Sequence, residues 1–380
     1  MRSNYKPIGN YIRRVEKRNG NMKVTRLLGL SMTKEFRETT SNIVGTDMAV
    51  YKVMEKWQFA CDFMSPIRVN KLPVVLKLDD EPNLVSPAYP VFEIIDKDEL
   101  DPEYLMMWFR RQEFDRYAAF KCDSAIRGGY DWDELCSTEL PVPRIDKQRE
   151  IVKEYNTIVD RINLNNQLIL KLEETAQAIY KQWFVDFEFP DEEGKPYKSN
   201  GGEMELIEEL EMEVPKGWEV NELQKIITFK NGKTRPNTIG NYPVYGGNGI
   251  VDFANDANAE DVIAIGRVGA YCGSLYRVVG KCWISDNAIY GKSNANLNMF
   301  SFYKLSSLKL NDRSEGTGQP LITQGLLNGI RTLLPEIETR KSFENYSKLL
   351  FLRTTNLKRE LDLLSDFKSL LLSKLATIEN

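Results

Sequence analysis

The sequence predicts an α+β chain in which two globular domains alternate with two long helices, as a pseudo-twofold internal repeat. Three observations support this prediction: a hydrophobic heptad pattern in mid-chain, a second copy of it 192 residues later (Ile151 against Phe343), and strand- and turn-rich stretches before each copy. The length of 380 residues and the hydrophobic content of 42% suffice for two to three folded domains.

The first helix is predicted from apolar residues that recur at alternating spacings of four and three. The series runs from Ile151 for about thirty residues to Trp183, with one polar position at Asn165. A helix that packs once against a domain has a wider, less regular apolar stripe, so this pattern predicts a coiled-coil helix over 143–187. Its expected core residues are Ile151, Ile158, Ile162, Asn165, Ile169, Leu172 and Ile179.

The second helix is predicted over 333–380, because seven of ten positions in the same frame are apolar. Pro335 occupies the place that Pro143 has before the first helix, and a proline followed by acidic residues is typical of a helix start. Its expected core residues are Leu350, Leu357, Leu361, Leu364 and Leu371.

The globular domains are expected at 1–142 and 217–332. Residues 5–20 and 217–232 resemble each other, and each segment ends in Asn-Gly. The stretch 188–216 is acidic and punctuated by glycine and proline, which favours an inter-domain linker or surface loop.

Composition excludes several classes of protein. The chain has no histidine, which excludes Ser-His-Asp and Cys-His catalysis and HExxH zinc sites. Its five cysteines form no CxxC pair, so we expect no disulfide framework, no thiolate metal site and a reducing, cytoplasmic location. Neither a P-loop nor a GxGxxG string is present, and the letters of a PD…ExK nuclease at 190–195 are too close together to converge on one metal. No catalytic or metal-binding residue is therefore predicted.

Some loops have the chemistry for nucleic-acid contact. The second domain contains a glycine-flanked arginine and loops that combine cations, aromatics and flexible backbone, and residues 1–40 carry ten Lys/Arg against three acids. The candidate DNA-binding residues are Lys34, Arg37, Arg127, Lys233, Arg235, Tyr245, Asn248 and Arg267. The alternative for these loops is an ordinary surface turn, and for the basic stretch a solvated face.

Several strings resemble the specificity subunits of Type I restriction–modification systems. ELPVPRIDKQREIV, LEETAQAIYKQWFVDFEFPDEEGKPYKSNGGEME and EVPKGWEVNEL are similar to the central conserved region of that family. NYPVYGGNGIV, IAIGRVGAYCG, ISDNAIY and GTGQPLITQGLLNGI extend the resemblance into the second half, and it is weaker over 21–120.

The resemblance implies that each globule is a target recognition domain for one half of a bipartite double-stranded DNA target. The two helices would form an antiparallel pair that sets the spacer and docks two methyltransferase subunits. About 40 residues of helix span roughly 60 Å, well over one turn of duplex. The chain itself would be non-catalytic and bind no cofactor, with S-adenosylmethionine and ATP/Mg on partner subunits, including restriction/translocase subunits. The second helix departs from the family pattern because it has no counterpart of WFVDF.

Two other classes of function remain open. A coiled-coil scaffold or interaction protein without DNA specificity would show no salt-sensitive duplex binding. An unrecognised enzyme would act without partners.

Overall fold

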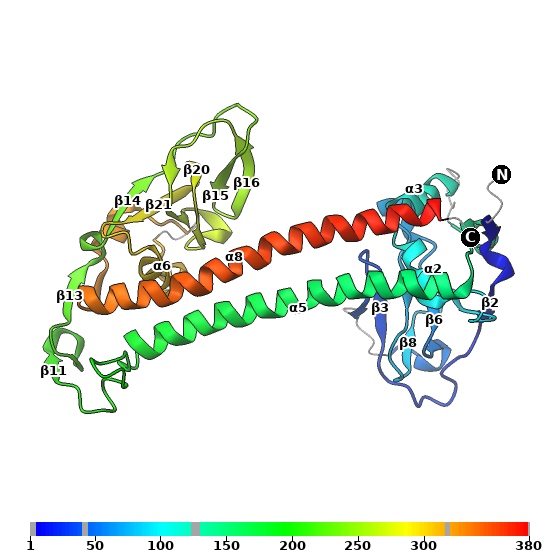
Figure 1. Cartoon of the computed structure of the whole chain (residues 1–380), viewed down its shortest axis with the longest axis horizontal. Helices are drawn as coiled ribbons and strands as arrows, with labels where there is room; N and C mark the ends of the chain where they lie inside the picture. The colour runs from blue at the N-terminus through cyan, green and yellow to red at the C-terminus, as the bar shows by residue number, and fades with distance from the viewer. Residues whose placement is uncertain (1–4, 40–44, 123–129, 316–319, 379–380) are drawn as a thin grey trace. The chain divides into compact units, whose positions relative to one another are not determined.

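The structure, a computed structural model, contains two mixed domains and two long helices, which confirms the predicted α+β class. The described residues are 5–39, 45–122, 130–315 and 320–378. The chain divides into two compact units, the first made of Met1–Asn165 with Arg359–Asn380 and the second of Asn166–Lys358. The long helices α5 (Ile145–Phe184) and α8 (Ile337–Lys374) each contribute to both units (Figure 1).

The first unit is built on an antiparallel sheet. In pairing order its strands are β2 (Ile12–Val15), β9 (Val91–Ile94), β6 (Gln58–Cys61) and β7 (Val74–Leu76). Three further antiparallel pairs are β1 (Tyr5–Pro7) with β10 (Glu139–Pro141), β3 (Leu28–Leu30) with β4 (Phe36–Glu38), and β5 (Lys52–Met54) with β8 (Asn83–Val85). The short helices are α1 (Ser65–Val69), α2 (Pro102–Phe109), α3 (Gln112–Lys121) and α4 (Trp132–Ser137).

The core of this unit is aromatic and includes one end of each long helix. Phe59 and Phe92 stack with their ring centroids 4.9 Å apart. Tyr155 of α5 and Leu372 of α8 belong to the same buried cluster. The fully buried Gln148 accepts a hydrogen bond from the Asp101 backbone nitrogen at 2.9 Å, immediately before α2. The unit is therefore fixed to α5 by both apolar packing and a buried amide.

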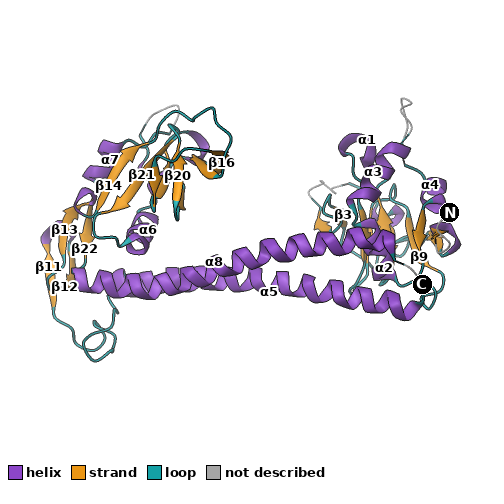
Figure 2. Cartoon of the chain, turned by 45° about the horizontal axis from the view of Figure 1, so that its top comes forward, coloured by secondary structure: helices purple, strands orange, loops and turns teal. Residues whose placement is uncertain are grey.

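The second unit contains two four-stranded sheets. The first has the order β14 (Ile227–Asn231), β21 (Ala288–Ser293), β18 (Ile263–Gly266) and β19 (Leu275–Arg277). The second has the order β16 (Gly249–Ala254), β15 (Tyr242–Gly246), β20 (Lys281–Ile284) and β17 (Ala259–Glu260), and β15 runs parallel to β20. Figure 2 shows these strands with α6 (Asn298–Ser307) and α7 (Gln324–Gly329) beside them.

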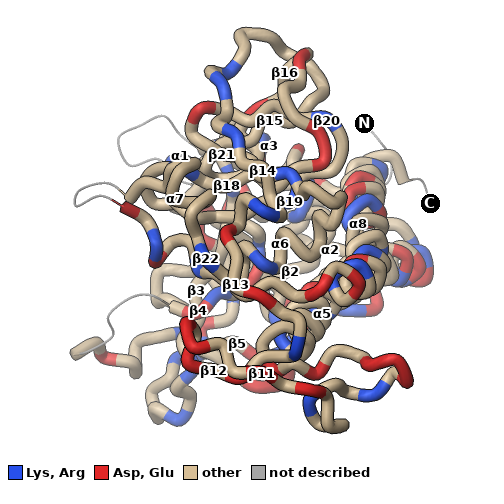
Figure 3. The backbone as a smooth tube through the Cα atoms, turned by 90° about the vertical axis from the view of Figure 1, so that its left-hand side faces the viewer, with Lys and Arg blue, Asp and Glu red and all other residues tan. Residues whose placement is uncertain are grey.

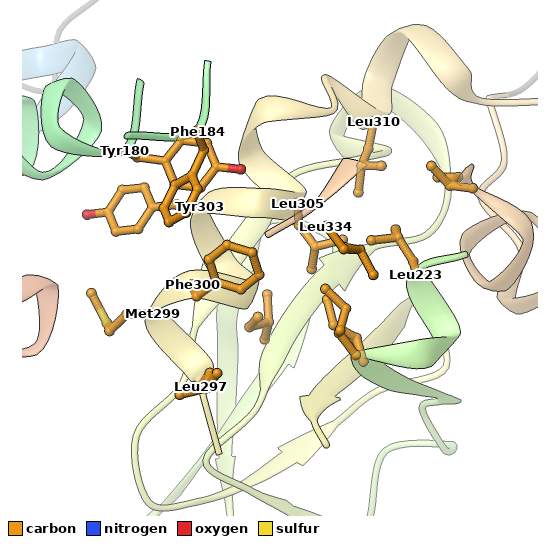
Figure 4. Close-up of a cluster of buried hydrophobic side chains, with 14 of the residues drawn as sticks. Tyr180, Phe184, Leu223, Leu297, Met299, Phe300, Tyr303, Leu305, Leu310 and Leu334 are labelled. Carbon is orange, nitrogen blue, oxygen red and sulfur yellow. The ribbon is translucent and has the colours of Figure 1, made fainter. Parts of the chain in front are cut away.

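Both long helices also enter the core of the second unit. Tyr180 of α5 stacks on Tyr303 of α6 with centroids 6.0 Å apart, and Phe184 lies edge-on to Phe300 at 5.2 Å (Figure 4). Phe343 of α8 is fully buried against the same rings. The aromatic end of the central helix is therefore structural, since it fills the centre of this unit.

In each unit, an early strand pairs antiparallel with the strand just before a long helix, which confirms the predicted duplication. In the first unit, β1 at the start pairs with β10 just before α5. In the second unit, β13 (Glu219–Glu222) pairs in the same antiparallel sense with β22 (Arg331–Leu334) just before α8. A short 3₁₀ turn and the first strand of a larger sheet follow β1 and β13 alike.

The long helices run antiparallel within each unit. In the first unit Arg161 Nε donates to Glu360 Oε1 at 2.7 Å, and in the second unit Lys358 Nζ donates to Glu173 Oε1 at 3.0 Å. In the second unit, α5 advances from Glu173 to Tyr180 while its contact on α8 moves back from Lys358 to Phe343, whose ring centroid lies 5.6 Å from that of Tyr180. All twelve predicted core residues of the helix pair are buried or half-buried, and Asn165 is fully buried.

The acidic stretch 188–216 differs from the linker or loop that the sequence predicts. It contains a hairpin of β11 (Met204–Ile207) and β12 (Met212–Pro215), and Val214 is fully buried in the core of the second unit. Figure 3 marks the positions of the acidic residues along this hairpin in red. The hairpin is part of the folded unit, with its charges on the solvent side.

No helix within the described residues is long and apolar enough to cross a membrane.

Candidate nucleic-acid interface

Several strands of the second unit end at one common edge. Asn231, the last residue of β14, pairs with Ile289 near the start of β21, and Gly266, the last residue of β18, pairs with Ala288. Because β15 and β20 are parallel, they end together at this edge as well. We name the loops that follow these strand ends the loop edge; it consists of residues 231–235, 246–249, 267–273 and 285–287.

Backbone hydrogen bonds tie these loops together. Arg267 N donates to Asn287 O at 3.0 Å, and Arg267 O accepts from Ile322 N at 2.9 Å. Lys233 N donates to Ile284 O at 3.0 Å. The loops are thus held by one another and by strand ends, which presents their side chains from a fixed backbone.

Close backbone approach explains two of the glycines at the loop edge. A Cβ atom added to Gly232 would lie 1.8 Å from Ser285 O, and one added to Gly266 would lie 2.1 Å from Tyr271 O. Any side chain at either position would force the loops apart. The glycine-rich strings of the second half therefore have a structural role.

The structure brings Lys233, Asn248 and Arg267 into this loop edge. Lys233 and Asn248 are exposed, whereas Arg267 is half-buried and its Nε has no hydrogen-bond partner among the described residues. Arg235 is exposed and forms an ion pair with Asp252 of β16, with Nη2 and Oδ2 2.9 Å apart. An incoming phosphate would have to compete with that carboxylate.

Tyr245 is placed differently from the other candidates. Its ring is half-buried beside Tyr276, with centroids 6.4 Å apart, and it packs on a small core of the second unit. Burial raises the pKa of Tyr245, so its hydroxyl stays protonated and keeps a hydrogen to donate.

In the first unit the structure removes Lys34 from the candidates. Its side chain is only 5% exposed, its Nζ lies 2.8 Å from Asp115 Oδ1, and it also donates to Phe109 O. Burial lowers the pKa of Lys34, partly offset by Asp115. A phosphate cannot reach this ammonium group, which ties the loop before β4 to α3.

Of the other two candidates in the first unit, Arg37 is exposed and donates from Nε to Leu30 O at 3.2 Å. Arg127 lies outside the described residues.

Part of the basic stretch at 1–40 pairs with acids from elsewhere in the unit. Arg13 pairs with Glu93 at 2.7 Å and Lys17 with Glu55 at 2.5 Å. Arg14 instead lies over the ring of Trp132 at 4.7 Å. These contacts therefore reduce the local excess of positive charge, while Lys6, Arg18 and Lys23 stay exposed.

Sequence reasoning missed a polar groove at the opposite end of the second unit. It has a volume of about 670 Å³, and its walls include Lys230, Lys281 and Lys292 from three different strands. Single lysines at exposed strand positions give no local signal in a sequence, because only the sheet order brings them together.

Comparison with known proteins gives three curated relatives, while no family model matches. The chain is 31% identical over 148 residues to the Type I restriction enzyme MjaIX specificity subunit of Methanocaldococcus jannaschii, which is 38% of this chain and 31% of that protein. It is 29% identical over 99 residues to the EcoprrI specificity subunit of Escherichia coli, and 34% over 91 residues to the HindI specificity subunit of Haemophilus influenzae. These matches cover 25% and 19% of the respective relatives, so at most about a third of any of the three is aligned.

The fold matches over nearly the whole chain. A crystal structure of the S subunit of a Type I restriction–modification system from M. genitalium aligns with a TM-score of 0.62 at 16% identity, covering 99% of this chain and 96% of that one. The predicted resemblance to Type I specificity subunits is thus confirmed in both sequence and fold.

Proposed function

We propose that the chain is the DNA-specificity subunit of a Type I restriction–modification system. In this role each unit reads one half of a bipartite duplex target, and the helix pair sets the number of base pairs between the halves. The observation that carries the proposal is the duplication: two units with the same closing strands are each joined to both long helices.

The loop edge has the chemistry for reading DNA in the second unit. Exposed Lys233 and Arg235 supply cations that would neutralise phosphates and set the register. Asn248 and Arg267 carry the donor and acceptor groups that distinguish base edges in the major groove. Tyr245, which immediately precedes the loop 246–249, is half-buried and packs on the small core of the second unit. In the first unit, Arg37 and Arg127 remain the proposed contacts.

The helix pair is suited to fix a spacing. A helix of 40 residues spans roughly 60 Å. Ion pairs in both units hold the register of the two helices, and the buried amide of Asn165 penalises alternative registers. A change in helix length or register would therefore change the gap between half-sites.

Exposed apolar side chains on α8 supply surfaces for partner subunits. Those of the second unit are Tyr346, Leu349 and Leu352, and those of the first unit are Leu363, Phe367 and Leu370. Soluble chains rarely leave such stripes uncovered, and one set in each unit suits two methyltransferase subunits. Adenine methylation with S-adenosylmethionine, and ATP/Mg-dependent translocation and restriction, would be performed by those partners. This chain would contribute no catalytic group.

The alternative is a coiled-coil scaffold without DNA specificity. It is favoured by the partial pairing of the basic stretch of the first unit with acids and by the net charge of −4. The loop edge favours the specificity role. Its cation and amide side chains project from loops whose close backbone contacts require glycine, and a scaffold would not require such side chains there.

A methylation map tests the proposal. The chain would be co-expressed with its neighbouring methyltransferase in a host without adenine methylation, and the genome sequenced for modified bases. We expect one bipartite methylated motif that disappears without this chain. Arg267→Ala should weaken modification at that motif, and the matched control Lys281→Ala, outside the loop edge, should not. Methylation without a bipartite motif, or independent of this chain, would favour the scaffold.

A further inference from the structure

A pocket in the first unit has features that the reading of DNA does not use. It has a volume of about 400 Å³ and lies between α3, the end of α2 and the paired strands β1 and β10. Four of the nine described residues that line it are aromatic. The residues that form this aromatic wall are Tyr5, Trp108, Phe114 and Tyr117. Pockets of this size and lining are typical of sites for small organic ligands.

One cation stands in this wall. Arg111 is only 6% exposed, and its guanidinium carbon lies 4.1 Å from the ring centroid of Trp108. Its ion pair with Glu113 is long, with Nη2 and Oε2 3.7 Å apart, and that carboxylate is half in solvent. Burial lowers the pKa of Arg111 from its usual value, so the site penalises its charge without a close counter-ion.

Two N–H groups of the pocket residues lack an acceptor among the described residues. They are Nε of Arg111 and Nε1 of Trp108, both buried. Buried donors are paired in the great majority of proteins, and leaving one unpaired costs about 1 to 3 kcal/mol. Both nitrogens have almost no accessible surface, so a ligand in the pocket would meet the ring of Trp108 and the remaining guanidinium atoms of Arg111.

From this arrangement we propose that the Arg111 pocket binds a small aromatic carboxylate. The aromatic walls take the ring of the ligand, and the carboxylate pairs with the guanidinium of Arg111. Glu113 and Glu139 also line the pocket, and they favour a single negative charge over the two charges of a phosphate monoester or the many of DNA. The site is independent of the proposed DNA-reading role.

Calorimetric titration of the full chain tests this assignment, with indole-3-acetate as probe. Indole-3-acetamide is the matched neutral ligand, and phenyl phosphate is the matched dianion. We expect the amide to bind at least about ten-fold more weakly than the carboxylate, because a charge-assisted hydrogen bond is lost, and the phosphate to bind more weakly as well. Equal binding of the amide, or tighter binding of the phosphate, would overturn the proposal.

Variants on opposite sides of the pocket separate binding from folding. Arg111→Gln should weaken indole-3-acetate at least about ten-fold, and Glu139→Gln should tighten it because a repulsive carboxylate is removed. Ser137→Trp, at an exposed position of the wall, should block entry. If Arg111→Gln does not fold, the opposite effects of the other two variants decide, and no change in either of them overturns the assignment.

A duplex competition completes the test. A 20-base-pair DNA should leave indole-3-acetate binding unchanged. Displacement of the probe would reassign the pocket to the DNA surface and contradict the proposal.

Discussion

The guanidinium carbon of Arg277 lies 3.4 Å from the ring centroid of Phe351, which joins β19 to α8 within the second unit. Arg277 is largely buried, and burial lowers its pKa to about 10. The ring supplies part of the stabilisation that water would otherwise give this cation. The pair is one of the side-chain links between the sheet that contains β19 and the long helix α8.

Replacing the ring should therefore destabilise the second unit beyond the loss of apolar area. We expect Phe351→Leu to lower the free energy of unfolding by about 1 to 2 kcal/mol, since it keeps most of the buried area but loses the cation–π contact. Chemical denaturation measures this change. The matched control is Leu352→Ala on the exposed side of α8, which should change stability by less than about 0.5 kcal/mol. An equal effect of both variants would show that the ring contact contributes nothing.

Glu344 links α8 to the second unit at another point. Its Oε2 accepts hydrogen bonds from the backbone nitrogens of Met299 and Phe300, at 2.9 and 3.0 Å, and so caps the first turn of α6. Glu344→Ala should cost about 1 to 2 kcal/mol, as for other lost helix caps. Denaturation with Glu338→Ala as control, an exposed acid in the first turn of α8, checks this. If Glu338→Ala lowers the free energy of unfolding by as much as Glu344→Ala, the effect would lie in α8 itself.

Lys304 makes stability depend on pH. It is 9% exposed, donates from Nζ to Leu333 O at 2.8 Å, and burial lowers its pKa from 10.5 to about 8. The unfolded chain therefore holds this proton more tightly, so stability rises with pH between about 8 and 10.5. Relative to Lys304→Met, the free energy of unfolding of the wild-type chain should rise by about 3 kcal/mol across that pH range. Denaturation of both at pH 7 to 10.5 measures the difference, and a constant difference contradicts the prediction.

Asn165 should limit the stability of the helix pair. It is fully buried, and neither its Oδ1 nor its Nδ2 has a hydrogen-bond partner among the described residues. We expect Asn165→Leu to raise the free energy of unfolding by about 1 to 3 kcal/mol. If the amide selects the register, the proposed methyltransferase complex built on the same variant should also modify targets with more than one spacer length. If modification still occurs at a single, unchanged spacer length, the ion pairs between the helices are enough to hold their register.

Salt dependence separates the lysines of the second unit. In the complex with its methyltransferase, Lys233→Ala should reduce the slope of log K against log salt by about 0.9, the value for one lost phosphate contact. Lys281→Ala, in the groove at the other end of the unit, should leave the slope unchanged. Fluorescence anisotropy at 50 to 200 mM salt measures both. The reverse result would move the DNA surface to the groove.

The helix pair could be predicted from the sequence because its signal is local and periodic. Spacings of four and three from Ile151 onward predict one buried seam, and the structure buries or half-buries every residue expected in it. The hairpin within 188–216 was missed, because the stretch is rich in acidic residues and only Val214 and Pro215 of its two strands are buried.

The candidate site could be predicted only in part, since it depends on sheet order. The glycine-rich strings drew attention to Arg267 and Asn248, but only the parallel pairing of β15 with β20 brings those loops to one edge. The burial of Lys34 depends on Asp115, 81 residues away, which no local pattern indicates.

The antiparallel pairing of β1 with β10, and of β13 with β22, means that the chain enters and leaves each globule at neighbouring points. The polypeptide segment between the two paired strands of each unit forms the globule, and this segment begins and ends beside a long helix. Such a segment can be exchanged as a cassette, because a different domain joined at the same two strands would leave the path of the helices unaltered. Under the proposed function, a chain of this construction would acquire a new half-site by recombination at its strand pairs, while its spacer and its partner surfaces would be inherited unchanged.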